Sequence, residues 1–210
     1  MITIEKISVM NMEIAVRGAR NPMNSWGKSD SYYDEQGTYI LGENDLDLCR
    51  RLAKAGSDHR KYLRQIFVSM DITAPLYWWK EFDTYKVATV ANSCSTMHKV
   101  HAKAFTREDF SCDRLSPAAL SQLDALIAFL EERRQEFVAT KDKSAWHDII
   151  QLLPSSYNQL RTVTMNYETL VNIYYARKSH KLAEWHTMCD TIKSLPYATD
   201  LILIKEENEA

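Results

Sequence analysis

The chain has 210 residues, of which 45% are apolar, and this suits one domain with a real hydrophobic core. It carries 26 Lys and Arg against 28 Asp and Glu, and the formal net charge of −2 excludes a strongly basic nucleic-acid-binding domain. Only 5 Gly and 5 Pro are present, which favours a helix-rich globular protein over a sandwich or barrel with many turns. No apolar run approaches the roughly 18 residues that a membrane span requires.

The N-terminal sequence and the cysteines indicate where the protein acts. The first residues lack the apolar core and the cleavage site of a secretion signal, so we expect no signal peptide. The cysteines lie far apart without a Cys-x-x-Cys pair, which favours reduced thiols over disulfides or structural zinc. We therefore expect a cytoplasmic protein with no membrane contact and no metal site. The cysteines are Cys49, Cys94, Cys112 and Cys189.

The first half of the chain predicts alternating short strands and helices. The clearest strand signal is the alternation of apolar residues from Ile66 to Ile72. Asn44 is the expected N-cap of a helix that Gly56 ends. The expected elements are a strand over 1–9, a helix over 12–20, a loop over 24–42, a helix over 46–55 and a strand over 66–72.

The second half predicts longer helices and one further strand. Pro75 fits the first turn of a helix that starts at Leu76, and Ser116-Pro117 is a strong start for a long helix. Residues 87–110 follow an irregular pattern. The remaining expected elements are a helix over 144–153, a strand over 157–165, a helix that Asn166 caps and that runs to Arg177, a helix over 182–196 and an acidic tail over 205–210.

Several residue clusters suggest chemistry but also have simpler explanations. His98 and His101 could share a metal on a helix, but no third ligand is near in sequence. Cys94 could be a nucleophile beside His98, although a polar loop with one thiol is the commoner situation. Trp78 and Trp79 could stack on a ligand ring, or one could lie in the core and the other at an interface. No glycine-rich phosphate loop occurs in the chain.

Asn166, Asn172 and Arg177 fall on one predicted helix. Asn offers both a donor and an acceptor, which suits the edge of a flavin or a pyrimidine. Arg offers a fixed fork of donors for carbonyl or phosphate oxygens. The structural alternative is that Asn166 caps the helix, Asn172 lies on the surface, and the positive charge of Arg177 stabilises the helix C-terminus.

The order of elements and these residues resemble the flavin-dependent thymidylate synthases. The resemblance covers most of the chain and is best over 65–86 and 152–186. It implies an α+β fold in which a central, mostly antiparallel sheet is flanked by helices, as a single domain over 1–204 with a tail over 205–210. The residues that carry it are Leu153-Pro154, Asn166, Asn172, Arg177, Ser179-His180 and Glu184.

The resemblance also implies functional roles. Asn166 and Asn172 correspond to flavin contacts and Arg177 to the contact with the uracil ring, so Arg177 is the expected catalytic residue. The implied cofactor is FAD, and the implied reaction converts dUMP to dTMP with methylene-tetrahydrofolate and NADPH in a homotetramer. Further expected positions are Lys86 for the cofactor and Ser93, Cys94 and Ser95 for the substrate.

The chain also departs from the pattern of this family. Where the family has Arg-His-Arg, an ungapped alignment places Thr84-Tyr85-Lys86, so only Lys86 keeps the charge. Each lost charged hydrogen bond weakens binding by about 1.5–3 kcal/mol. The alternative is therefore a protein of this fold that binds a nucleotide or a flavin without making thymidylate. A purely structural or interaction protein is the third possibility.

Overall fold

The computed structural model describes residues 2–204, and these divide into two compact units. The first unit consists of Ile72–Thr84 and Asn92–Thr162 with the start of the chain. The second consists of Ile4–Asp71, Tyr85–Ala91 and the chain from Val163 onward. The predicted acidic tail over 205–210 lies outside the described residues.

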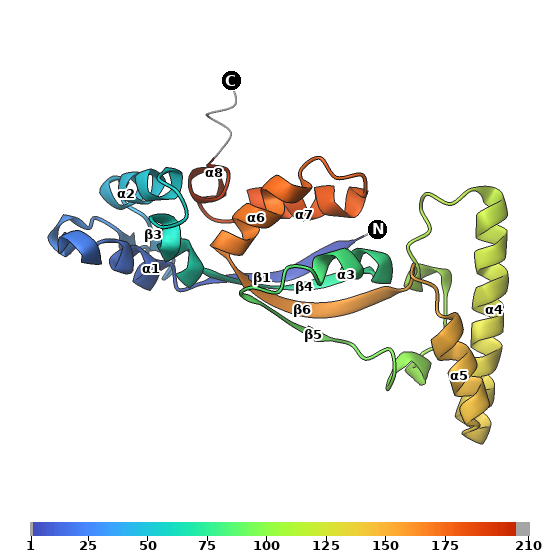
Figure 1. The fold of residues 1–210 in the computed structure, drawn as a ribbon. Coiled ribbons are helices and arrows are strands. Elements are labelled where there is room, and N and C mark those ends of the chain that lie inside the picture. Colours follow the sequence, from blue (N-terminus) through green and yellow to red (C-terminus); the bar gives the residue numbers. More distant parts are fainter. Residues whose placement is uncertain (1, 205–210) are drawn as a thin grey trace. The chain divides into compact units, whose positions relative to one another are not determined.

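A four-stranded, mostly antiparallel sheet flanked by helices is the central element of the fold, as expected for an α+β protein (Figure 1). The interior of β4 alternates between buried residues, such as Val68 and Met70, and partly exposed ones, such as Ser69 and Asp71. This period of two confirms the strand prediction and gives the strand one core-facing side. The strand order is β1 (Thr3–Met10), β4 (Phe67–Pro75), β6 (Asn158–Asn166) and β5 (Thr89–Ser93).

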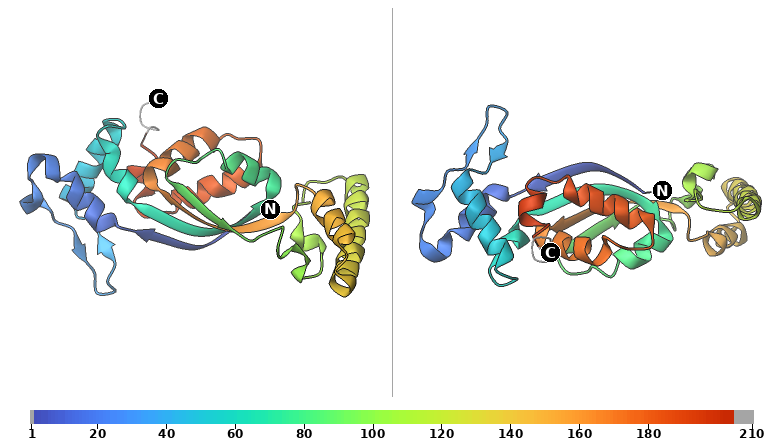
Figure 2. Two further views of the ribbon diagram at one scale, coloured as in Figure 1. Left: turned by 60° about the horizontal axis from the view of Figure 1, so that its bottom comes forward. Right: turned by 90° about the horizontal axis from the view of Figure 1, so that it is seen from above.

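The N-terminal part of the second unit consists of short helices and one small hairpin. The segment between α1 and α2 extends as a narrow hairpin in both views of Figure 2. Sequence patterns predicted only a loop there, because the paired strands contain two residues each. The elements are α1 (Met12–Ala19), η1 (Asn21–Met23), η2 (Trp26–Lys28), β2 (Tyr32–Tyr33), β3 (Tyr39–Ile40), α2 (Glu43–Lys54) and η3 (Arg60–Gln65).

The start of α2 corrects one prediction. Asn44 is not the N-cap, because the helix begins at Glu43 and Gly42 occupies the cap position. The carboxylate of Asp30 accepts hydrogen bonds from the backbone N–H groups of Asn44 and Asp45, at 2.9 and 3.1 Å. Asp30, 14 positions before Asn44, therefore accepts hydrogen bonds from N–H groups that have no partner within this helix.

The C-terminal part of the second unit is helical, and its boundaries follow the prediction closely. The side chain of Asn166 caps α6 by accepting a hydrogen bond from the Thr169 N–H at 2.9 Å. Helices α6 and α7 lie side by side in Figure 1. The helices are α6 (Tyr167–Arg177), α7 (Ala183–Lys193) and α8 (Ala198–Leu201).

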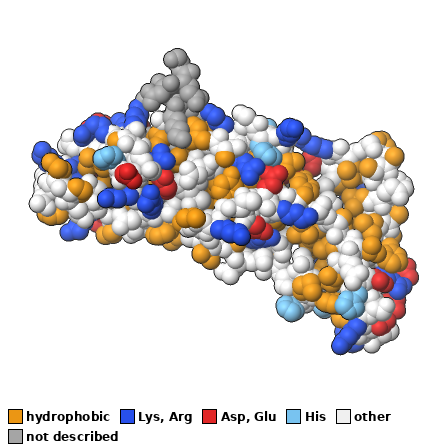
Figure 3. Space-filling view, viewed as in Figure 1, with side chains coloured by type: hydrophobic (Ala, Val, Ile, Leu, Met, Phe, Trp, Pro, Cys, Tyr) orange, Lys and Arg blue, Asp and Glu red, His pale blue; other side chains and the backbone are white. Residues whose placement is uncertain are grey.

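A helical hairpin dominates the first unit, and both of its helices match predicted ones. Ser116 caps α4 as expected, and Leu130 and Ile149 are fully buried in the core between the helices and the preceding segment. Figure 3 shows apolar side chains gathered over this hairpin, and Phe129 and Val138 are among its exposed ones. The helices of this unit are α3 (Leu76–Phe82), η4 (Val100–Ala102), η5 (Arg107–Asp109), α4 (Pro117–Thr140) and α5 (Lys143–Leu152).

Membrane-spanning helices and clusters of metal ligands were sought among the described residues. Among residues 2–204, none of the helices combines the length and the apolar character that a bilayer span needs. Within the same residues, no three His, Cys, Asp or Glu side chains are grouped so that they could hold a metal ion.

Candidate functional site

Arg177 lies at the end of α6 in a cluster of aromatic side chains. Its Nε donates a hydrogen bond to the hydroxyl oxygen of Tyr85 at 2.8 Å. Its guanidinium carbon lies 4.5 Å from the ring centroid of Trp185 and 5.5 Å from that of Tyr85. Because the guanidinium is planar, contacts with two rings fix the direction in which its remaining N–H groups point.

The turn between α6 and α7 supports this cluster. The His180 N–H donates to the carbonyl oxygen of Arg177 at 3.0 Å, and the ring of His180 lies 6.2 Å from that of Trp185. Trp185 is fully buried, and Glu184 is buried beside it in the chain. The matching residues Ser179-His180 and Glu184 thus lie in or next to the turn that holds Arg177.

Asn166 caps α6, which is the structural alternative to flavin binding that its sequence position suggested. Its side-chain oxygen accepts hydrogen bonds from the N–H and the hydroxyl of Thr169, at 2.9 and 3.0 Å. Its amide nitrogen donates to the carbonyl oxygen of Arg64 at 3.2 Å. An Asn amide has two N–H donors, so one donor of Asn166 is left after these bonds.

Asn172 and Lys86 are both exposed in the second unit. A helix rises 1.5 Å per residue, so the backbones of Asn166 and Arg177 lie about 16 Å apart along α6, with Asn172 between them. The helix therefore does not bring all three predicted residues to one point. Lys86 directly follows Tyr85 in the chain, next to the residue that contacts Arg177.

The predicted substrate residues Ser93, Cys94 and Ser95 lie in the first unit, at and beyond the end of β5. The Cys94 N–H donates to the Leu160 carbonyl at 2.9 Å, and the Cys94 thiol is exposed. The hydroxyl oxygen of Ser95 accepts hydrogen bonds from the N–H groups of Met97 and His98 at 3.2 and 3.0 Å. These bonds leave the hydroxyl hydrogen of Ser95 able to donate.

The two tryptophans of α3 are both core residues. Trp78 is 0% exposed and Trp79 is 1% exposed, so neither ring is accessible to a ligand. Arg161 stacks on Trp79 at 4.3 Å and donates from Nη1 to Asp83 at 2.7 Å. The prediction that one of these rings lies at an interface or under a ligand is therefore wrong.

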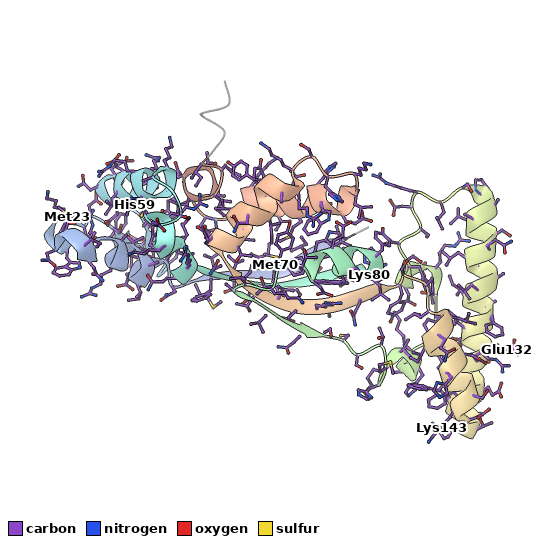
Figure 4. The ribbon with its side chains drawn as sticks, in the orientation of Figure 1. Met23, His59, Met70, Lys80, Glu132 and Lys143 are labelled. Atoms are coloured by element: carbon purple, nitrogen blue, oxygen red, sulfur yellow. The ribbon has the colours of Figure 1, made fainter. Side chains whose placement is uncertain are left out.

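The second unit also contains a cavity that sequence patterns did not predict. Its volume is about 820 Å³, within the range of small-molecule sites. Met23 and His59, both labelled in Figure 4, are on its lining. Gln65 also lines it and follows Arg64, whose carbonyl holds the Asn166 amide. The end of η3 therefore supplies both a residue of the cavity lining and the carbonyl that binds Asn166, 102 positions away from Arg64.

The fold is that of the flavin-dependent thymidylate synthases, which confirms the expected fold class. Thymidylate synthase X from Helicobacter pylori, solved with FAD and dUMP, matches with a TM-score of 0.64 and 16% identity over 96% of each chain. A second structure of the flavin-dependent enzyme from Helicobacter pylori, complexed with FAD and dUMP, matches with a TM-score of 0.64 and 17% identity. That match covers 94% of this chain and 98% of the other. No protein-family model and no curated protein matches the sequence.

Proposed function

We propose that the protein is a flavin-dependent enzyme that methylates a uracil nucleotide, converting dUMP to dTMP. The observation that carries this proposal is the position of Arg177, held by Tyr85 and Trp185 at the end of α6, in a fold shared with an enzyme solved with FAD and dUMP. We further propose methylene-tetrahydrofolate as the carbon donor, NADPH as the reductant, a homotetramer as the assembly and the cytoplasm as the location.

The residues of the second unit fit a bound flavin in part. Asn172 is exposed, and its amide can both donate and accept hydrogen bonds. Lys86 is also exposed, and its positive charge suits a phosphate. Asn166 binds the Arg64 carbonyl and keeps one further N–H donor, and Gln65, which follows Arg64, lines the cavity of about 820 Å³. We assign FAD to these residues and this cavity. Bound FAD would supply the redox chemistry of methylation, and the chain would supply orientation and positive charge.

The uracil ring of the substrate is assigned to Arg177. The guanidinium of Arg177, oriented by its bond to Tyr85, is a charged donor group, and a uracil carbonyl oxygen is a suitable acceptor for such a group. Within the first unit, Ser93 and Ser95 carry hydroxyl donors and Cys94 is exposed, and these three remain the predicted substrate residues of that unit. Preorganised donors of this kind stabilise charge that develops on the ring during reaction.

Turnover tests this proposal. Purified protein, FAD, methylene-tetrahydrofolate and NADPH are incubated with dUMP labelled with tritium at ring carbon 5, and released tritium is counted. Methylation replaces that hydrogen, so the proposal predicts release that depends on all of the additions. Absence of release from a flavin-loaded protein would contradict the enzymatic assignment.

A second candidate function is binding of flavin or nucleotide without thymidylate synthesis. Two observations favour it: Tyr85 occupies Nε of Arg177, and Thr84-Tyr85-Lys86 stands where the family has Arg-His-Arg. Under this alternative, FAD or dUMP raises the melting temperature while no tritium is released. A protein that responds to neither ligand and releases no tritium contradicts both candidates.

A further inference from the structure

A buried ion pair joins η3 to the first turn of α6. The Nε of Arg60 donates to Oε2 of Glu168 at 2.9 Å and to its Oε1 at 3.2 Å, and the Nη2 of Arg60 donates to Oε1 at 3.1 Å. The two side chains are 10% and 13% exposed. A guanidinium that binds both oxygens of a carboxylate fixes the orientation of the two groups as well as their distance. The pair therefore holds the start of η3 against α6 in a defined geometry.

Two further hydrogen bonds fasten the same two elements. The carbonyl oxygen of Arg64 accepts from the Asn166 amide at 3.2 Å, and the carbonyl oxygen of Ile66 accepts from the Tyr167 N–H at 3.0 Å. Both acceptors lie at or just after the C-terminal end of η3, whereas Arg60 is its first residue. The segment is thus tied to the start of α6 at both of its ends.

The cavity of about 820 Å³ uses the same segment as part of its wall. Its lining includes the residue before Arg60 and three residues of η3, namely His59, Lys61, Tyr62 and Gln65. Neither Arg60 nor Glu168 lines the cavity. The ion pair therefore acts on a ligand in the cavity through the residues that it holds in place.

On the other side of the pair, α6 carries the two asparagines that we assign to the flavin. Glu168 lies in the first turn of this helix, after Asn166 and one turn before Asn172. The pair thus connects the cavity wall to the part of α6 between these two residues. A ligand that contacts both the wall and α6 needs the spacing between them to be fixed.

Stability alone does not account for a buried pair of this kind. Removing two charges from water is costly, and replacing a buried ion pair by apolar side chains is often neutral or stabilising. Apolar side chains do not supply the fixed geometry of a bidentate contact. We infer that Arg60 and Glu168 are positioning residues for FAD, which set the place of the α6 asparagines relative to the cavity wall. This inference rests on the proposed assignment of FAD to this cavity and to α6.

Titration of the purified protein with FAD tests the inference, with quenching of flavin fluorescence as the measure of Kd. Arg60→Met combined with Glu168→Met removes both charges, and its melting temperature should stay within about 4 °C of the wild type. Its Kd for FAD should nevertheless rise about tenfold or more, because the assigned contacts lose their common position. The visible circular dichroism of the bound flavin should change as well, which a merely structural role of the pair would not produce.

A second variant and a control accompany the double variant. Arg60→Lys keeps the charge without the bidentate contact, so its Kd should also rise, and it decides the question if the double variant does not fold. The control is Arg51→Met combined with Asp47→Met, which removes an exposed ion pair of α2. These two residues lie on the helix that supplies Leu48 and Leu52 to the cavity but do not line it, so the Kd should stay unchanged.

The outcomes separate this inference from the proposed function. If the wild type binds FAD and the Arg60 variants bind it within about twofold of the wild type with unchanged dichroism, the inference is overturned and the proposed function stands. An equal rise of the Kd in the α2 control also overturns the inference, because the effect is then not specific to the pair. Failure of the wild type to bind FAD overturns the assignment of FAD, and the inference with it.

Discussion

The guanidinium carbon of Arg177 lies 4.5 Å from the ring centroid of Trp185, a fully buried residue of α7. The contact joins the last residue of α6 to the helix packed beside it, and the hydrogen bond to Tyr85 fixes the guanidinium from a third segment. A donor held in this way is preorganised, because its orientation need not be selected when a ligand binds.

Replacement of Arg177 by Ala is expected to abolish turnover of dUMP. The variant loses the donors proposed for the uracil ring, whereas the cation–π contact that it also loses is worth only about 0.5–2 kcal/mol of stability. Tritium release measures turnover and circular dichroism checks the fold. Lys178→Ala, a substitution of the exposed neighbouring residue, is the control and should retain activity. Normal turnover in Arg177→Ala would show that the residue has no role in the reaction.

Replacement of Tyr85 by Phe is expected to release the Arg177 donor while keeping the ring that stacks on it. The lost hydrogen bond should destabilise the protein by about 0.5–1.5 kcal/mol. Because the hydrogen bond that orients the Arg177 guanidinium is lost, dUMP should bind more weakly, and titration calorimetry measures the change in Kd. Tyr32→Phe, at an exposed tyrosine of the β2–β3 hairpin, should change neither quantity. Unchanged or tighter dUMP binding in Tyr85→Phe would contradict the role of this hydrogen bond in orienting Arg177 for the nucleotide.

Gly42→Ala is expected to destabilise the protein by about 1–3 kcal/mol. A Cβ at this position would overlap the Asp30 side chain and lie 2.5 Å from the Asp30 carbonyl oxygen, so the segment that caps α2 has to move. A Cβ at Gly27 meets no atom within 4 Å, which makes Gly27→Ala the matched control. Urea unfolding gives both free energies, and equal values for the two variants would exclude this close approach.

Glu131 is expected to make stability depend on pH in the acid range. Hydrogen bonds, first from Arg134 and then from Gln135 and the Phe105 N–H, outweigh partial burial and lower the pKa of Glu131 from 4.5 to about 2. A lowered pKa stabilises the folded state above about pH 4.5, and that stabilisation is lost as the pH falls toward 2. Glu131→Gln should therefore be less stable than the wild type at pH 7, and the difference should shrink below pH 4.5.

Urea unfolding at pH 7, 4 and 3 measures this difference. The control is Glu132→Gln at the next position of α4, where the carboxylate is 68% exposed and pairs with Arg133. Exposed ion pairs contribute about 0–1 kcal/mol, so this variant should stay close to the wild type at every pH. A constant gap between Glu131→Gln and the wild type over the whole range would contradict the assigned pKa.

Local patterns predicted the elements whose signals are strong and continuous. The alternation that ends at Ile72 marked β4, and the Asn166 cap marked the start of α6 within one residue. Strand β5 was missed because four of its five residues are exposed, and it carries no alternation of buried and exposed positions. The β2–β3 hairpin was missed because its strands are too short to show a period.

Long-range contacts explain what sequence patterns could not supply at the site. The partner of Arg177 is 92 residues away, and the side chain that caps α2 comes from Asp30, in the segment before the helix. No spacing rule connects such pairs. For Trp78-Trp79 the sequence suggested an accessible ring, but both rings are buried. Composition alone does not distinguish a buried ring from an accessible one.

A visible absorption spectrum tests most directly whether this chain binds a flavin. The purified protein is incubated with FAD and passed through a gel-filtration column, and the protein peak is scanned. We expect a retained flavin band. Asn172→Ala should weaken this band and leave the melting temperature of the unliganded protein unchanged, since Asn172 is exposed. A protein peak without flavin absorbance, even after incubation at high FAD concentration, would contradict flavin binding.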